Sequence, residues 1–174
     1  AQLNNNYTPL YELADDLMRS GTFGELQTVD GWWTRRNGIP FYGDWFGIKE
    51  KSGGGPGIDL MPHLLGWLLG VMDWPKVNWV SARTFSKAEP GCPGYGPYGG
   101  GKRRPDGVFN VERRIQVYSQ LANGVTMNVD AAWAMHTDLE RMGFRLIGSK
   151  ATLLIERVWP INDGDDAKAV DTAV

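Results

Sequence analysis

The sequence predicts an α+β domain built on an open-faced, mostly antiparallel sheet of about six strands, with helices covering one face. Three observations support this prediction: alternating apolar residues define several strands, hairpin turns separate consecutive strands, and only two segments of the 174 residues have a helical pattern. Hairpins join antiparallel neighbours, and a pair of helices covers one face of such a sheet. A chain of this length forms a single domain with a sizeable core.

The first element is predicted to be a helix over Pro9 to Ser20. Thr8 stands at the N-cap position, Pro9 is suited to the first helical position, and Gly21 follows the last turn. Leucines recur at helical spacing between these signals. The segment therefore begins and ends at positions that the sequence itself marks.

The second helix is expected within the apolar segment from Ile58 to Gly70. Proline is tolerated only in the first turn of a helix, so Pro62 limits where this helix begins. That limit places Asp59 at or near the N-cap and His63 about one turn later.

Strands are predicted where β-branched, aromatic or alternating apolar residues gather, namely over Leu26–Thr34, Val77–Phe85, Val108–Leu121, Val125–Met135, Phe144–Ile147 and Ala151–Ile155. In the first of them, Val29 and Trp33 fall on one face and Trp32 on the other. Asn123-Gly124 is the preferred two-residue hairpin turn, and Gly148-Ser149-Lys150 marks another hairpin.

Two segments rich in glycine and proline, Asn37 to Gly57 and Ser86 to Gly107, are predicted to be long loops. Loops of this length are usually functional or disordered. Residues 161–174 are acidic and rich in alanine, and they do not have the pattern of a packed domain end. The sequence therefore assigns residues 1–160 to the domain and 161–174 to a tail.

Composition excludes several classes of function. Lys plus Arg number 18 against 20 Asp plus Glu, and this net charge of −2 argues against a nucleic-acid binder or a polybasic membrane-surface protein. The single cysteine, Cys92, excludes an intramolecular disulfide. The longest strongly apolar stretch, Leu64 to Met72, is far shorter than the ~20 residues of a membrane span, and the N-terminus lacks an apolar signal segment. We expect a cytoplasmic protein without nucleic-acid or membrane partners.

Asp59 and His63 are the candidate catalytic residues. Their spacing of four places both side chains on one face of a helix. A histidine beside a carboxylate can exchange a proton with a substrate hydroxyl, which reversible alcohol oxidation requires. From the spacing alone, the alternative that Asp59 is an N-cap and His63 a core histidine stays open.

Four further residues are candidate substrate contacts. Trp33 and Trp45 present aromatic faces that suit a sugar ring, whereas Arg35 and Lys51 carry charges that bind hydroxyls or carboxylates. Core packing of the tryptophans and solvation of the charges are the alternatives. His136 would complete a two-histidine, one-carboxylate metal set, but nothing in the sequence places it near the others, so no metal site is predicted.

Several ordered motifs carry a resemblance to a known family. They are Asn-x-Tyr-x-Pro at 5–9, Ser-Gly-x-x-Gly-x-Leu at 20–26, the strand tryptophan Trp33, Gly-Gly-Gly-x-x-x-Asp-x-x-x-His at 53–63, and Leu-Leu-x-Trp-Leu-Leu-Gly at 64–70. In this order they resemble the C-terminal domain of the glucose-fructose oxidoreductase, inositol dehydrogenase and rhizopine-catabolism family (Gfo/Idh/MocA). The resemblance covers residues 1 to about 157. The chain departs from the family pattern at Asn6, Met61 and Gly66, which leaves the substrate preference open.

The resemblance implies the substrate half of an NAD(P)-dependent oxidoreductase that acts on a sugar, a polyol or a related hydroxyl compound. His63 would be the proton donor or acceptor and Asp59 its partner. Gly54 and Gly55 would lie at the edge of the nicotinamide site. The Rossmann domain that binds NAD or NADP and supplies a catalytic lysine would precede residue 1. The isolated chain is therefore expected to be inactive and to bind no cofactor.

Family relatives also self-associate through the open sheet face, so a homo-oligomer is expected. Two alternatives stay open. One is a non-catalytic carbohydrate-binding or oligomerisation module, and the other is a relative that uses the nicotinamide for transient oxidation during glycoside cleavage.

Overall fold

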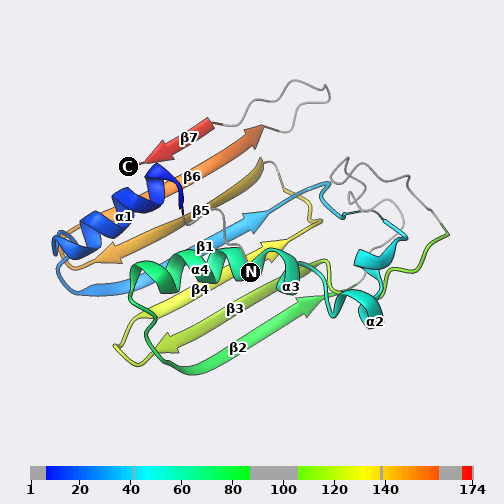
Figure 1. Cartoon of the computed structure of the whole chain (residues 1–174), viewed down its shortest axis with the longest axis horizontal. Helices are drawn as coiled ribbons and strands as arrows, with labels where there is room; N and C mark the ends of the chain where they lie inside the picture. Colours follow the sequence, from blue (N-terminus) through cyan, green and yellow to red (C-terminus); the bar gives the residue numbers. More distant parts are fainter. Residues whose placement is uncertain (1–6, 41, 87–105, 138, 161–169, 174) are drawn as a thin grey trace.

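The computed structural model describes residues 7–40, 42–86, 106–137, 139–160 and 170–173. Its centre is a seven-stranded sheet with the order β2-β3-β4-β1-β5-β6-β7. Helices α1 and α4 lie on the same face of this sheet (Figure 1). The α+β class, the open sheet and its mostly antiparallel pairing are therefore confirmed.

The strands span Leu26–Thr34 (β1), Val77–Phe85 (β2), Arg114–Leu121 (β3), Thr126–Ala132 (β4), Leu139–Gly148 (β5), Thr152–Pro160 (β6) and Val170–Ala173 (β7). The first two agree residue for residue with the predicted segments. Every neighbouring pair is antiparallel except β1 and β4, which run parallel. The sheet is thus mixed, because β1 is inserted between β4 and β5, which come much later in the chain.

Both predicted hairpins form. Gly124 has a φ of 87° in the turn between β3 and β4, a backbone angle that glycine adopts without strain. The β5–β6 hairpin turns through Ser149 and Lys150 and is longer than predicted, because the outer parts of both strands are polar and do not alternate cleanly. Conversely, β3 begins only at Arg114, so the predicted strand from Val108 loses its first six residues.

The sheet also has one strand more than expected. Val170–Ala173, inside the segment that the sequence assigns to a tail, pairs antiparallel with β6. A strand of four residues is too short to show a recognisable alternation pattern. It is therefore identified only from its pairing with the edge of β6 in the structure. Cys92, the basic residues 102–104, Asn5 and Asn6 lie outside the described residues.

Helix α1 spans Pro9–Arg19, as predicted to within one residue. The Thr8 side chain accepts a hydrogen bond from the Tyr11 backbone N–H, at 3.4 Å, which satisfies one of the donors left free at a helix N-terminus. Helix α1 contacts α4, and α4 packs on β1 and β4. The two helices and the sheet enclose the core.

The second predicted helix forms as two pieces, α3 (Pro56–Asp59) and α4 (Met61–Val71). Asp59 lies near the N-cap of α4, as predicted, but is not the N-cap itself: it ends α3, and Leu60 takes the N-cap position of α4. The cause is Pro56, which starts a helical turn six residues before Pro62. Leu60 itself has helical backbone angles, φ −94° and ψ −38°, so the chain stays nearly helical across the junction.

Alternation along β1 decides which side chains face the helices. Val29 is completely buried on the helix-covered face, and Gly31 follows it there. A Cβ atom at Gly31 would lie 2.8 Å from Cδ1 of Leu68, so the missing side chain makes room for α4. Trp33 lies on this same face, since it is two residues further along β1.

Candidate functional site

Helices α3 and α4 hold the two predicted catalytic residues. Asp59 ends α3 and His63 lies in the first turn of α4, and Leu60, which directly follows Asp59, joins the two helices with helical backbone angles. His63 N–H donates to the Leu60 carbonyl at 3.1 Å, which continues the helical path. The two side chains therefore lie about one turn apart, as their spacing predicts.

His63 lies against the strand β1. Its ring meets the Trp33 ring edge-on, with ring centroids 5.7 Å apart and an interplanar angle of 66°. The Arg35 guanidinium lies 4.9 Å from the centroid of the same indole. Three of the predicted site residues are thus in one cluster, ordered His63, Trp33, Arg35.

The Nδ1 atom of His63 is buried and has no hydrogen-bond partner among the residues that the structure describes. Buried polar atoms are nearly always paired, because an unpaired one loses its bonds to water without replacement. An orphaned imidazole nitrogen is therefore expected where another molecule completes the site. This observation disfavours the reading of His63 as a satisfied core histidine.

Asp59 is fixed by a residue that the sequence analysis did not single out. Its Oδ2 atom accepts a hydrogen bond from the Trp133 indole N–H at 2.8 Å. Trp133 follows the end of β4 and is completely buried. The Asp59 side chain is therefore not used as an N-cap, and one of its oxygens is held by a donor from the sheet.

The glycine segment before α3 is packed against Glu112. The Oε1 atom of Glu112 accepts hydrogen bonds from the backbone N–H groups of Gly55, at 2.9 Å, and Gly57, at 3.1 Å. A Cβ atom at Gly54 would lie 2.9 Å from Ile58, and one at Gly55 would collide with the Glu112 carbonyl. Glycine is thus required here so that two segments of this chain can approach each other closely.

We expect Glu112→Ala to lower the free energy of unfolding by about 1–3 kcal/mol, because it leaves two backbone N–H groups without their acceptor. Glu112→Gln keeps an oxygen at the same place and should lose less. Urea unfolding followed by circular dichroism measures both changes. Equal losses for the two variants would contradict this role of the Oε1 atom.

Trp45 and Lys51 lie in the segment that leads to the glycines. Trp45, in the short 3-10 helix η2 (Trp45–Gly47), is 46% exposed and packs on Phe46 with ring centroids 4.0 Å apart. Phe46 in turn meets Trp133 edge-on, at 6.2 Å. Lys51 is exposed in α2 (Lys49–Ser52). Through Phe46, these aromatic contacts connect Trp45 to Trp133, which binds Asp59. Lys51 remains a candidate only because it lies close in sequence to the glycine segment.

Trp32 and His136 lie outside the cluster of His63, Trp33 and Arg35. The Trp32 indole N–H donates to Glu156 Oε1 at 2.9 Å on the open sheet face, opposite to Trp33. His136 is exposed, after the end of β4. In the part of the chain that the structure describes, no group of three or more His, Cys, Asp or Glu residues has a geometry suited to a metal ion.

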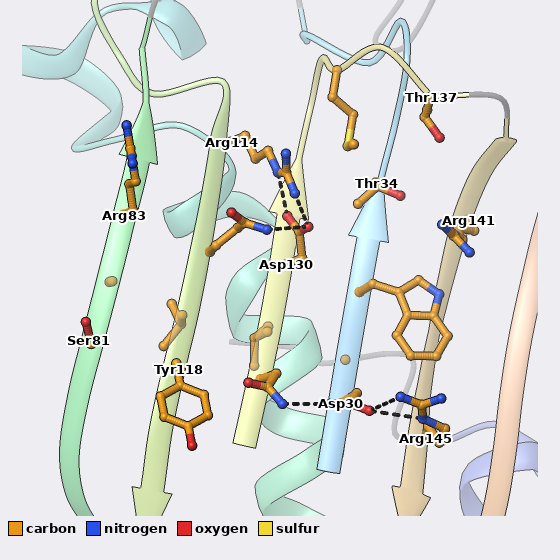
Figure 2. Close-up of a pocket in the computed structure, with 18 residues that line it drawn as sticks. Asp30, Thr34, Ser81, Arg83, Arg114, Tyr118, Asp130, Thr137, Arg141 and Arg145 are labelled. Atoms are coloured by element: carbon orange, nitrogen blue, oxygen red, sulfur yellow. Dashed lines mark hydrogen bonds and ion pairs between the residues drawn. The ribbon is translucent and has the colours of Figure 1, made fainter. Parts of the chain in front are cut away.

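The open sheet face carries a polar groove of about 720 Å³ (Figure 2). Asp30 accepts from Arg145 Nη2 at 2.6 Å and from Asn128 at 2.8 Å. Arg114 and Asp130 form a bidentate pair, with a shortest distance of 2.6 Å. The groove and the His63 cluster lie on opposite faces of the sheet, so the groove is not the cavity of the candidate site.

The sequence contains no strong signal for the contacts that Trp133 and Glu112 make with the Asp59 segment. Trp133 belongs to a predicted strand where tryptophan is ordinary, and Glu112 precedes β3 among charged residues. Both act on the Asp59 segment across more than 50 residues of sequence. A contact between residues that far apart in the sequence leaves no pattern among neighbouring residues, so it cannot be recognised from the sequence alone.

Fold and site together define a class: a sheet domain that presents an imidazole and a fixed carboxylate from two consecutive helices. Comparison with known proteins then identifies the family. Residues 11–154 match the GFO/IDH/MocA C-terminal domain, and the chain belongs to that family. The resemblance that the motifs predicted is confirmed.

Two curated proteins are similar to this chain. D-glucoside 3-dehydrogenase of Escherichia coli (strain K12) is 27% identical over 151 residues, which cover 84% of this chain and 41% of that protein. A putative UDP-kanosamine synthase oxidoreductase subunit of Amycolatopsis mediterranei (strain S699) is 30% identical over 135 residues, 74% of this chain and 36% of that protein. This chain therefore spans about two fifths of the length of these relatives.

Solved structures share the fold. A levoglucosan dehydrogenase in complex with NADH and levoglucosan aligns with a TM-score of 0.71 at 17% identity, over 99% of this chain and 45% of that one. GenD2 from gentamicin A biosynthesis, in complex with NAD, aligns with a TM-score of 0.69 at 22% identity, over 88% of this chain and 38% of that one. Within the described residues, no helix is long and apolar enough to cross a membrane.

Proposed function

We propose that this chain is the substrate-binding half of an NAD(P)-dependent oxidoreductase that acts on a hydroxyl group of a sugar, a polyol or a related compound. The observation that carries the proposal is that His63, whose Nδ1 is buried and unpartnered among the described residues, follows Asp59 by four residues across the junction of α3 and α4. The relatives support the substrate class, since one is a D-glucoside 3-dehydrogenase and a structural neighbour binds levoglucosan. In this proposal, residues 1–160 form the substrate domain.

We infer that residues of this chain would meet a nicotinamide only at its edge. The side chains missing at Gly54 and Gly55 make room for Ile58 and Glu112, so these glycines do not form an empty phosphate cradle. Gly53 has open space around its Cβ position and a φ of 83°. We therefore assign dinucleotide binding, and the further catalytic lysine, to a Rossmann domain outside this chain, with residues 53–55 facing the nicotinamide.

When bound, the nicotinamide supplies the hydride acceptor or donor. The role of the residues in this chain is to transfer the hydroxyl proton. His63 takes the hydroxyl proton when an alcohol is oxidised to a ketone and returns it in the reverse direction. Asp59, with Oδ2 held by Trp133, orients the imidazole or the substrate hydroxyl through its second oxygen. Trp33 borders His63, Arg35 lies over the Trp33 ring, and both would contact the sugar, with Trp45 and Lys51 in the segment that leads to the glycines.

The test is to assay the intact protein with NAD and with NADP against D-glucosides and polyols, and to follow absorbance of the reduced nicotinamide. We expect turnover with at least one sugar. We expect no turnover from residues 1–174 alone, because the dinucleotide-binding half is absent from them. Dehydrogenase activity of the 174-residue chain would contradict the proposal that a separate Rossmann domain binds the dinucleotide.

The two alternative functions give different results in the same assay. A relative that cleaves glycosides would release the aglycone without net accumulation of reduced nicotinamide. A non-catalytic module would bind sugar or self-associate, and His63→Ala would change neither property. Net reduction of the cofactor with a free sugar would exclude both.

We also propose that the open sheet face joins two or more copies of the protein. Its ion pairs are internally satisfied, and the exposed aromatic pair Trp79 and Tyr118, with ring centroids 5.2 Å apart, adds apolar area. A sheet face without covering helices is otherwise left to solvent.

We expect light scattering to give an oligomer for the native protein and a shift toward monomer for Tyr118→Asp, which places a charge in the contact. Val80→Asp is the matched control, because Val80 lies on the neighbouring strand β2 with its side chain on the opposite face. A native monomer at high concentration, or equal effects of the two variants, would contradict this interface.

A further inference from the structure

Trp133 makes a contact that packing alone does not require. Its indole N–H donates to Asp59 Oδ2 at 2.8 Å, and the side chain is completely buried. Trp67, in α4, is a second buried tryptophan, 6% exposed, and its indole nitrogen has no hydrogen-bond partner within the described part of the chain. Trp67 serves as an internal comparison for Trp133, because its buried indole N–H makes no such contact with a carboxylate.

The backbone and ring of Trp133 are held from three sides. Its N–H donates to the Arg113 carbonyl at 2.9 Å, and its carbonyl accepts from the Gly38 N–H at 2.7 Å. Phe46 contacts the ring edge-on. An indole held in this way presents its N–H in one direction.

The chemistry of the donor defines what this contact can do. An indole nitrogen only donates and carries no charge, so it binds a carboxylate oxygen without neutralising the group. It occupies one of the two oxygens of Asp59 and restricts rotation of the side chain. The other oxygen is left for the imidazole or for a substrate hydroxyl.

We propose that Trp133 is a positioning residue: it holds the Asp59 carboxylate in the orientation that the oxidoreductase reaction uses. The inference rests on the proposed function for its catalytic consequence, whereas the contact itself can be tested without turnover. Trp133 acts through Asp59 and is not expected to touch the substrate.

The kinetic test is Trp133→Phe in the intact protein, which keeps most of the ring and removes the N–H. We expect kcat to fall about 10- to 100-fold, the effect of losing one hydrogen bond to a charged group, with KM changed less than about threefold. In an Asp59→Ala background, Trp133→Phe should cause no further loss, because its partner is already absent. Trp67→Phe is the control, since it removes an indole N–H that has no acceptor, and kcat should stay unchanged.

The spectroscopic test follows the indole N–H signals of the intact protein labelled with 15N-tryptophan. Asp59→Ala should move the Trp133 signal, identified by its loss in Trp133→Phe, and leave the Trp67 signal in place. If the Trp133 signal does not respond, or if Trp133→Phe and Trp67→Phe have equal kcat, the positioning role is wrong. If the signal responds but the native protein oxidises no sugar, the contact stands and the proposed function fails.

Discussion

His63→Ala should lower kcat of the intact oxidoreductase by about 10²- to 10⁴-fold, the usual contribution of a positioned general acid or base. The imidazole is the group in the described site that can accept and return the hydroxyl proton. Its Nδ1 atom has no hydrogen-bond partner in the described ranges of the chain, so removal of the imidazole breaks no hydrogen bond at this atom. Initial rates with saturating sugar and NAD measure the effect.

His136→Ala is the matched control, because the chain contains two histidines and His136 is exposed after the end of β4. We expect it to retain native kcat. His63→Gln, which keeps a polar group of similar size, should be nearly as impaired as His63→Ala because an amide does not exchange the proton. Similar rates for the His63 and His136 variants would remove the catalytic assignment.

Leu68→Ala should lower the free energy of unfolding by about 2–5 kcal/mol, the range for large cavities left by buried leucines. Leu68 is completely buried, and its Cδ1 atom occupies the space that the missing Gly31 side chain leaves above β1. The same helix carries His63, so this contact sets where the imidazole lies relative to Trp33. Urea unfolding of the domain measures the change.

Leu13→Ala is the control for this prediction, because Leu13 is 40% exposed on α1, and it should change stability by only about 0.5 kcal/mol. A second variant tests the contact directly. Gly31→Ala adds a methyl group toward Leu68, so the double variant Gly31→Ala/Leu68→Ala should lose less than the sum of the single losses. Strict additivity would show that Leu68 is stabilised by other neighbours.

Much of the fold follows from local patterns. The start of α1 was marked by Thr8 and Pro9, its end by Gly21, and the β3–β4 hairpin by Asn123-Gly124, because caps and tight turns depend on neighbouring residues. The strand β7 and the start of β3 were not predicted. Strand length depends on which partner lies alongside, and that partner is distant in sequence.

The catalytic pair was recognisable because its spacing matches a helical turn and its motif resembles a family. The residues that surround the catalytic pair were not recognisable from the sequence. Trp133 reaches Asp59 from the end of β4, and Glu112 reaches Gly55 and Gly57 from the segment before β3. A separate helical turn also starts at Pro56 and ends at Asp59, and the Asp59 side chain accepts the indole N–H of Trp133 rather than capping α4.

By itself, the sequence determined the class of the domain, the strands with clear alternation, the helix α1 and the Asp59–His63 spacing. Each of these depends on interactions between residues close in the chain. Only the tertiary structure decided that Trp33 and Arg35 join His63, that Trp32 belongs to the open face, and that Trp133 holds Asp59. These contacts depend on the insertion of β1 between β4 and β5, a pairing over about 100 residues that no local pattern encodes.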